Sequence, residues 1–440
     1  MTPDSDTDTD SDGVDEALAL VAAPVAAPRA AEAHRATPWA AARVVAARAG
    51  AAREPRPTPL GQALGHVLAE PLRALTDLPS FDTSAMDGWA VAGPGPWEIH
   101  EEGAVLAGHA PDAALADGTA VRIATGARVP RGTTAVIRSE HSRTDAAGHL
   151  HARREVVHGQ DIRLRGQECR SGDRLLPAGT AVTPAVLGLA AAAGYDELPT
   201  LPRPRVEILV LGDELLTAGL PHDGLIRDAL GPMLGPWLNA LGAEVLATRR
   251  IGDDADALAA AVADSPADLV ITTGGTAAGP VDHVHPVLAK AGATLLVDGV
   301  KVRPGHPMLL ARLDRDRLLV GLPGNPLAAV SGLLTLAEPL LRSLAGAPAP
   351  PPYQVPVRDE VHGHPHDTRL VPIVHHGDQA VPLHYNGPAM LRGIAAADGM
   401  AVVPPGGARP GDALEILDLP WPVSPGQATA QGSAHGACFT

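Results

Sequence analysis

Glycines and acidic residues follow several apolar runs in the middle of the sequence. The run "VEILVL" is followed by Gly212 and Glu214, and "DLVITT" is followed by Gly274, Gly275 and, further along the same loop, Asp282. Glycine lets a ligand approach the backbone, and carboxylate oxygens are the ligands that Mg²⁺ prefers. The stretch "TTGGTAAGPVDHV" is therefore either a turn between a strand and a helix or a loop that holds an anion or a metal ion.

The turn "GLPGNP" offers a second place for an anion. Asn325 suits the N-cap of a helix and Pro326 its first position, while Gly324 leaves the backbone open. The free N–H groups at the start of the helix would suit a phosphate. An ordinary strand–helix turn has the same composition, so both interpretations stay open.

Three acids, Glu214, Asp253 and Asp282, would repel an anion unless a cation bridges them. We therefore predict that they bind Mg²⁺. The alternative role of Asp253 is to cap the helix predicted in "DADALAAAVA". Asp87 in "SAMDGWAV" and Thr125 in "RIATGARVP" are further polar candidates, although each motif alone is typical of a turn between strands.

The elements that must position these residues are clearest between residues 203 and 347. Apolar runs typical of buried strands ("VEILVL", "AEVLAT", "DLVITT", "TLLVDG", "RLLVGL") alternate with helical stretches such as "RDALGPMLGPWLNALG" and "NPLAAVSGLLTLAEPLLRSLAG". This alternation predicts a mostly parallel sheet with helices on both faces. Because such sheets bind ligands at the carboxyl ends of their strands, we expect the acids and glycines to share one edge.

The rest of the chain divides by composition into smaller units, and the fold class we expect is a multidomain α/β plus β protein. Its central three-layer α/β domain is joined by an elongated N-terminal α/β region, an inserted small β domain and a C-terminal β barrel. The expected boundaries are a disordered tail at 1–36, the elongated domain at 37–79 and 149–202, the insertion at 80–148, the α/β domain at 203–347, the barrel at 353–418 and a loose tail at 419–440. The stretches "TPWAAARVVAARAGA" and "PLGQALGHVLAEPL" show helical spacing.

Composition excludes several classes of protein. The formal net charge is −16, and no basic tract occurs, which argues against a nucleic-acid partner. No run of 18 apolar residues occurs, so we expect no transmembrane helix. Cys169 and Cys438 lie far apart and match no metal or redox spacing, which is typical of a reducing compartment. We expect a cytoplasmic protein.

Seven motifs, taken in order, resemble one known family. They are "FDTSAMDGWAV" (81–91), "RIATGARVP" (122–130), "GQDIR" (159–163), "GDEL" (212–215), "TGG…G…D" (273–282), "RPGHP" (303–307) and "GLPGNP" (321–326). In this order they resemble the molybdopterin molybdenumtransferase (MoeA) family, which includes the C-terminal domain of gephyrin. The resemblance covers about residues 37–418.

The resemblance implies an enzyme of molybdenum-cofactor synthesis. Family members take adenylylated molybdopterin, release AMP and insert molybdate, with Mg²⁺ assisting. They are homodimers in which the inserted β domain faces the partner's α/β domain, so the cleft is shared; other cofactor-synthesis proteins and apo-molybdoenzymes are further candidate partners. By position, the resemblance assigns catalysis to Asp87, Glu214, Asp253 and Asp282, the metal to the last three, and ligand binding to Thr125, Gly274, Gly275, Thr276, Arg303, Gly305, Pro323, Gly324 and Asn325.

Several positions depart from the family pattern, and they remove polar groups. The family's Val-Ser-Val is replaced by Thr276-Ala277-Ala278, and its Asp-Ser/Thr-Asn is replaced by Asp228-Ala229-Leu230. A family Ser or Thr is replaced by Leu211, and a family Lys is replaced by Gly299, with Lys301 nearby. The Lys of "PGKP" is replaced by His306, and a C-terminal "GS" is replaced by Gly387-Pro388. One alternative is therefore a paralogue that binds or carries molybdopterin without efficient insertion. Another is a nucleotide-processing enzyme that shares only the α/β domain, which the "SAMDGWAV" motif argues against.

A group of histidines lies near the C-terminus. His362, His364, His366, His375 and His376 are close in sequence, and alternate histidines can bind a transition metal. The competing interpretation, which we favour, is a solvated loop.

Overall fold

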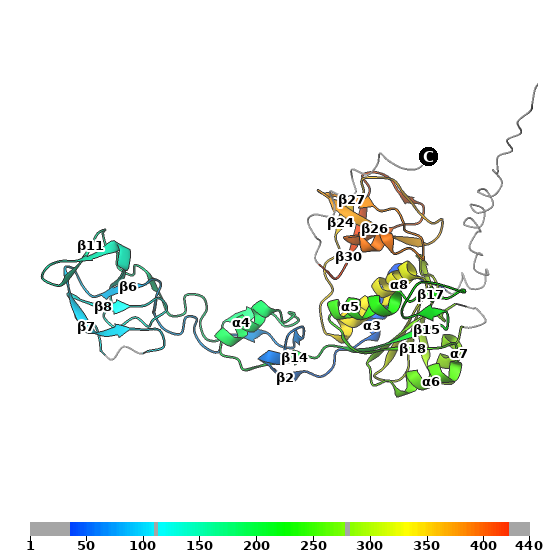
Figure 1. Ribbon diagram of the computed structural model, residues 1–440, viewed down its shortest axis with the longest axis horizontal. Helices are drawn as coiled ribbons and strands as arrows, with labels where there is room; N and C mark the ends of the chain where they lie inside the picture. The colour runs from blue at the N-terminus through cyan, green and yellow to red at the C-terminus, as the bar shows by residue number, and fades with distance from the viewer. Residues whose placement is uncertain (1–35, 110–112, 278–281, 422–440) are drawn as a thin grey trace, which may run out of the picture.

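The computed structural model describes residues 36–109, 113–277 and 282–421, and it shows an elongated molecule (Figure 1). The α/β domain and the C-terminal β unit lie together at one end. A small middle unit connects them to a β sheet at the other end. The predicted fold class is confirmed.

The α/β domain is built on a six-stranded sheet with the order β18-β15-β19-β23-β22-β20. Its first four strands are parallel. Strand β22 runs antiparallel to its neighbours β23 and β20, so β20 has the same direction as the first four. All five predicted strands are present; the antiparallel β22 is an addition that the sequence pattern did not reveal. The strands are β15 (Arg205–Leu211), β18 (Glu244–Ile251), β19 (Leu269–Thr273), β20 (Thr294–Asp298), β22 (Leu309–Arg312) and β23 (Leu318–Leu322).

Helices cover both faces of this sheet, as predicted (Figure 1). Apolar residues of alternate sheet positions point to opposite faces and form two separate cores, one around Leu234 and Leu340, the other around Leu258 and Leu288. The first face carries α3 (Trp39–Ala49), α5 (Leu230–Ala240) and the continuous helix formed by α8 (Pro326–Gly332), η3 (Leu333–Ala337) and α9 (Glu338–Leu344); the second carries α6 (Ala255–Asp264) and α7 (Val284–Lys290).

Helix α3 is in a different place from the one expected. The sequence placed residues 37–79 in the elongated N-terminal region, but Trp39, Ala42 and Ala46 are buried in the core of the α/β domain. The indole N–H of Trp39 donates to Thr335 Oγ1 at 3.1 Å. The helix packs here because its small residues allow close approach to the helix that ends at Leu344.

One helix in the described part of the chain, Pro326–Leu344, is long and apolar enough to cross a membrane by length and composition alone. It is 83% buried within the α/β domain. Its apolar surface is thus explained by packing in the protein core, since a fully enclosed helix needs apolar residues on every side.

The inserted unit is a six-stranded sheet with the order β10-β11-β7-β8-β6-β9. It extends to Ala152, slightly beyond the expected boundary at 148, because β11 pairs with β7. The strands are β6 (Gly88–Val91), β7 (Trp97–Val105), β8 (Thr119–Ile123), β9 (Ala135–Arg138), β10 (Ser142–Thr144) and β11 (His149–Ala152), with a 3-10 turn, η2 (Ser139–His141).

The middle unit contains short strands around one helix. The helix predicted in "PLGQALGHVLAEPL" is wrong: a 3-10 turn, η1 (Leu60–Gln62), is followed by strands, because Leu68 and Leu72 pack into a small core with Leu198 instead. The elements are β2 (Arg56–Pro59), β3 (Val67–Leu68), β4 (Leu72–Arg73), β5 (Thr83–Ser84), β12 (Ile162–Arg163), β13 (Arg174–Leu176), β14 (Glu197–Leu201) and α4 (Pro184–Ala192).

The C-terminal unit continues directly from the α/β domain. Strand β21 (Val300–Arg303) pairs with β26 on one side and with β1 (Thr37–Pro38) on the other, so three distant segments share one sheet. The remaining elements are β24 (Gln354–Pro356), β25 (Val361–His362), β26 (Thr368–His376), β27 (Gln379–Pro382), α10 (Arg392–Ala395), β28 (Gly399–Val403), β29 (Gly407–Ala408) and β30 (Ala413–Asp418).

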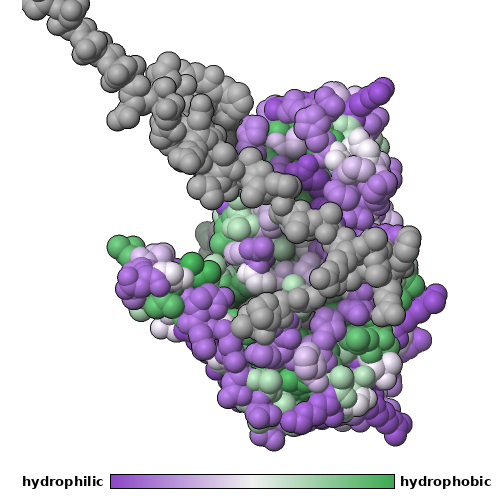
Figure 2. Space-filling view, turned by 90° about the vertical axis from the view of Figure 1, so that its right-hand side faces the viewer, coloured by the Kyte–Doolittle hydropathy of each residue, from purple (hydrophilic) through white to green (hydrophobic). Residues whose placement is uncertain are grey.

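The face shown in Figure 2 is mostly hydrophilic, with hydrophobic residues in small separate patches.

Candidate active site

A cavity of about 160 Å³ lies at the carboxyl ends of β15, β18 and β19. This is the edge at which parallel α/β sheets bind ligands. Its lining combines three acids with glycine backbone and a histidine. The residues are Leu211, Gly212, Glu214, Gly252, Asp253, Asp254, Leu258, Gly274, Gly275 and His283.

Two of the predicted metal ligands, Glu214 and Asp253, line this cavity together. Both are exposed to solvent, so their charges are available to a ligand. Asp253 does not cap the following helix. The neighbouring Asp254 does, because its Oδ1 accepts the N–H groups of Asp256 and Ala257 at 2.8 and 3.1 Å. The capping alternative for Asp253 is therefore wrong.

Two glycines make room for the acids at this edge. Gly212 has φ +128°, and a Cβ at this position would lie 2.2 Å from Glu214 Oε2. A Cβ on Gly252 would lie 2.5 Å from Asp213 Oδ1. Each distance is too short for real atoms, so a side chain at either position would displace the carboxylate that lies over it. Only Gly212 also has a left-handed backbone that favours glycine.

This packing predicts the effect of Gly212→Ala. The added methyl must displace the Glu214 carboxylate, and we expect turnover to fall by at least about tenfold because small misplacements of catalytic groups are costly. The left-handed backbone adds a loss of about 1–3 kcal/mol in unfolding free energy. Steady-state turnover and chemical unfolding measure the two effects separately.

Gly219→Ala is the matched control. Gly219 has φ +82°, but nothing lies within 4 Å of its Cβ position. It should therefore lose stability and keep its turnover. Equal turnover in the two variants would contradict a role for the Glu214 position.

The Gly-Gly turn after β19 forms one wall of the cavity. Gly274 and Gly275 both have positive φ, at +79° and +66°, and the N–H of Gly274 donates to Leu322 O at 2.8 Å. A Cβ on Gly324 would lie 3.6 Å from Gly274 Cα, so the two glycine turns pack against each other. The predicted nearness of these turns is thus observed.

Thr276 and Asp282 are not among the residues that line the cavity. Thr276 is buried, and its methyl group would lie 2.8 Å from a Cβ added to Gly321, so the two residues pack closely. Asp282 is half-buried and immediately precedes His283, which does line the cavity. Ala278 lies outside the described residues.

The turn at Asn325 differs from the expected phosphate site. Asn325 occupies the N-cap position of α8, but its side chain makes no capping hydrogen bond. The N–H groups of Leu327 and Ala328 donate to Pro388 O at 2.9 and 3.2 Å. The prediction of free N–H groups is therefore wrong, because a loop of the C-terminal unit accepts two of them. Pro323 is buried beside this turn.

Arg303 points toward the C-terminal unit. Its Nε donates to Asp367 Oδ2 at 2.9 Å, and it is not among the cavity residues. Burial, together with the charge of Arg303, lowers the pKa of His364, although Asp367 opposes this shift. Gly305 has φ +109°, and a Cβ there would lie 2.9 Å from Ala328 O, so it allows close packing on α8.

Asp87 and Thr125 lie together in the inserted sheet. The N–H of Thr125 donates to Asp87 Oδ1 at 2.8 Å, and both residues are exposed. Within one chain this pair is remote from the cavity, because the inserted sheet occupies the opposite end of the molecule (Figure 1). The residues predicted to form the site therefore lie in two separate groups within one chain.

The histidine group is not a metal site in the described part of the chain, where no three His, Cys, Asp or Glu side chains are grouped to hold a metal ion. His364 Nδ1 instead accepts the N–H groups of His366 and Asp367 at 3.3 and 3.0 Å. His362 lies in β25, and His375 and His376 lie in β26, so only His364 and His366 lie in a loop, as was predicted for the whole group.

Sequence reasoning missed His283 as a cavity residue and Pro388 as the partner of α8. His283 is adjacent to Asp282, so its place in the loop was a usable signal. Pro388 accepts the N–H groups of α8 through its backbone carbonyl, so its residue type gave no indication of this contact.

An acidic, glycine-walled cavity at the carboxyl edge of a three-layer α/β domain is typical of a ligand-binding site, here in a multidomain protein. Three family profiles match consecutive parts of the chain. They are the MoeA N-terminal region (domain I and II) at residues 14–194, the probable molybdopterin binding domain at 207–343 and the MoeA C-terminal region (domain IV) at 354–419.

Curated relatives agree with these profiles. Molybdopterin molybdenumtransferase 2 of Mycobacterium tuberculosis is 38% identical over 325 residues, covering 70% of this chain and 79% of the relative. A molybdopterin molybdenumtransferase of Staphylococcus aureus is 30% identical over 378 residues, covering 82% and 89%. The solved MoeA protein of Pyrococcus horikoshii shares the fold, with a TM-score of 0.69 at 24% identity over 87% of this chain and 99% of that one.

The chain therefore belongs to the molybdopterin molybdenumtransferase (MoeA) family, and it is an enzyme of that family, which acts in molybdenum-cofactor biosynthesis. The N- and C-terminal profiles also match the chain, so the alternative that it shares only the α/β domain with its relatives is wrong.

Proposed function

We propose that the protein inserts molybdate into adenylylated molybdopterin in a Mg²⁺-dependent reaction that releases AMP. The observation that carries this proposal is the cavity in which Glu214 and Asp253 face the backbone of Gly274 and Gly275. Acids and a glycine turn without side chains on one cavity suit a phosphate that arrives with a divalent cation.

The residues of the cavity fit Mg²⁺. This ion is commonly held by one or two carboxylates, several waters and substrate phosphates, so two exposed acids suffice. Glu214 and Asp253 would hold the ion, whereas Asp254 is committed to its helix. The predicted third ligand, Asp282, is not grouped with them in the described part of the chain. When bound, Mg²⁺ would neutralise phosphate charge during hydrolysis of the phosphoanhydride.

The chain's own residues would position the substrate. Gly274 and Gly275 have no side chain to keep phosphate oxygens from the backbone. Asp87 is exposed, and its Oδ1 is oriented by the Thr125 N–H. Because this pair is remote from the cavity in one chain, the proposal includes a homodimer in which the inserted sheet of one protomer completes the cleft of the other.

The test is to incubate the protein with adenylylated molybdopterin, molybdate and Mg²⁺ while measuring AMP release. We expect AMP release to require molybdate, to stop when EDTA removes the metal, and to return with excess Mg²⁺. Tight binding of the substrate without molybdate-dependent AMP release would instead support the carrier alternative. The contact of Pro388 O with α8 is the observation that favours that alternative, since it occupies N–H groups otherwise available to a phosphate.

The cellular setting completes the proposal. We propose that the enzyme acts in the cytoplasm, because its two cysteines match no disulfide framework or metal motif. Other cofactor-synthesis proteins or apo-molybdoenzymes would supply its substrate or receive its product.

A further inference from the structure

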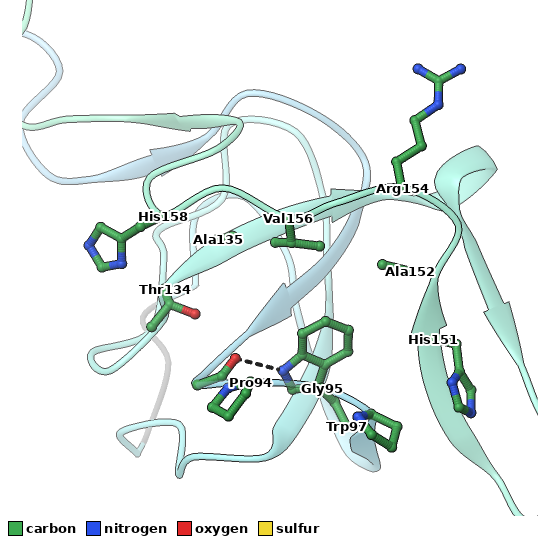
Figure 3. A pocket seen from close by; sticks show the side chains of 12 residues that line it. Pro94, Gly95, Trp97, Thr134, Ala135, His151, Ala152, Arg154, Val156 and His158 are labelled. Atoms are coloured by element: carbon green, nitrogen blue, oxygen red, sulfur yellow. Dashed lines mark hydrogen bonds between the residues drawn. The ribbon is translucent and has the colours of Figure 1, made fainter.

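A second, larger cavity lies on the inserted sheet. Its volume is about 590 Å³, and it is formed by the turn between β6 and β7, the start of β9 and the segment that follows β11 (Figure 3). The residues that matter for its chemistry are Gly95, Trp97, Thr134, His151, Arg154 and His158. We call it the insertion groove.

The insertion groove is at the opposite end of the sheet from Asp87. Strand β6 begins at Gly88, next to Asp87, and ends at Val91, close to the groove residue Gly93. Its neighbour β9 begins at the groove residue Ala135 and runs antiparallel to β6. The groove is therefore separate from the half-site that contains Asp87 and Thr125, and a ligand bound there leaves that half-site open.

The floor of the groove is closely packed. Trp97 is 5% exposed, and its indole N–H donates to Gly93 O at 3.1 Å. A Cβ on Gly95 would lie 2.6 Å from the indole ring, so the turn is packed directly on the ring. Figure 3 shows the indole near the centre of the groove, with His158 and His151 on opposite sides in this view. A preformed floor reduces the ordering cost of binding.

The rim of the groove carries one arginine, Arg154, and a histidine, His158. Arg154 and His158 are exposed, and within the described residues neither makes an ion pair. His151 differs, because its Nε2 lies 2.7 Å from Asp145 Oδ2, and this hydrogen bond lowers the pKa of Asp145 to about 2. Arg154 therefore gives the groove one positive charge that no ion pair in the described residues offsets, and this favours an acidic ligand.

The N-terminus of the same chain has the matching chemistry. Residues 1–16 contain seven acids and no base, and Asp4, Asp6, Asp8, Asp10 and Asp12 alternate with other residues. This spacing concentrates negative charge in a short stretch of the sequence.

The N-terminal segment is long. Thirty-five residues precede Ala36, the first described residue, and they correspond to a contour of up to about 120 Å. The cavity of the α/β domain would repel such a segment, because Glu214, Asp253 and Asp254 line it. We propose that the insertion groove binds the acidic N-terminal segment of this chain, with Arg154 as its main charged contact.

The test uses a fluorescent peptide of residues 1–16 and the full chain in which the five aspartates are replaced by Asn, so that the chain's own segment does not compete. We expect saturable binding by fluorescence anisotropy. Arg154→Glu in this chain should weaken binding at least about fivefold, since it turns one attraction into a repulsion. The control, Arg143→Glu, changes an exposed arginine of the same sheet that does not line the groove, and should change binding less than about twofold.

Competition supplies a second readout. The chain with its natural N-terminus should bind the peptide more weakly than the five-Asn chain, because its own segment is present at high effective concentration. Three results would overturn the proposal: no saturable binding, equal losses in the two arginine variants, or equal affinity with and without the natural N-terminus. None of these measurements involves turnover, so they are independent of the proposed function.

Discussion

Asp253→Asn is expected to lower molybdate-dependent AMP release by about 100- to 1,000-fold, the size of effect that follows from losing several kcal/mol of transition-state stabilisation by a metal ion. Asp253 lines the cavity beside Glu214, and its carboxylate is exposed. Asn keeps the shape of the side chain but removes the charge that would hold Mg²⁺.

The same substitution should leave folding intact. Asp254, not Asp253, caps α6, so the unfolding free energy should change by less than about 0.5 kcal/mol. Raising the Mg²⁺ concentration should recover part of the lost activity, since the defect is weaker metal binding. Initial rates over a Mg²⁺ series, with urea unfolding of the same preparation, measure both predictions.

Asp254→Asn is the matched control. Asn is as good an N-cap as Asp, so the helix should be kept. Because Asp254 Oδ1 already accepts two N–H groups, we expect the loss of turnover to be less than about fivefold. A larger loss of turnover in Asp254→Asn than in Asp253→Asn would show that Asp254, and not Asp253, is the acid required for turnover.

Asp87→Asn is expected to reduce turnover about 100-fold although Asp87 is remote from the cavity of its own chain. The proposed reason is that the inserted sheet of one protomer completes the cleft of its partner. Asn can still accept the Thr125 N–H, so the loop should keep its conformation.

Mixing the two inactive variants tests this arrangement. In a two-fold dimer, a hybrid of Asp87→Asn and Asp253→Asn protomers has one cleft with both changes and one with neither. Random pairing makes half of the dimers hybrids, so activity should return to about a quarter of the unmodified level. Co-expression with two affinity tags allows the hybrid to be isolated and assayed. Failure of the purified hybrid to recover activity would show that Asp87 does not act across a dimer.

The parts of this protein that sequence reasoning predicted are those set by local pattern. Runs such as "DLVITT" are continuously apolar, and only a strand covered on both faces needs that composition, so the five strands were found. The parallel order then placed Glu214, Asp253 and the Gly274–Gly275 turn on one edge without any knowledge of distances.

Local pattern also misled in two places. The spacing in "PLGQALGHVLAEPL" is helical, but glycines and prolines weaken the helix, and Leu68 and Leu72 gain more burial as short strands. Strand β22 was missed because "LLAR" is too short to distinguish from a helix by period.

The sequence by itself determined the family, the α/β sheet and the acids at its edge, because these depend on residue types that recur at short spacing. Only the tertiary structure decided which acid caps α6, where α3 packs, and that Pro388 O accepts the N–H groups of α8. It also separated Asp87 from Glu214 within one chain. These outcomes depend on backbone groups and on contacts between segments far apart in sequence, and local composition does not reveal either of them.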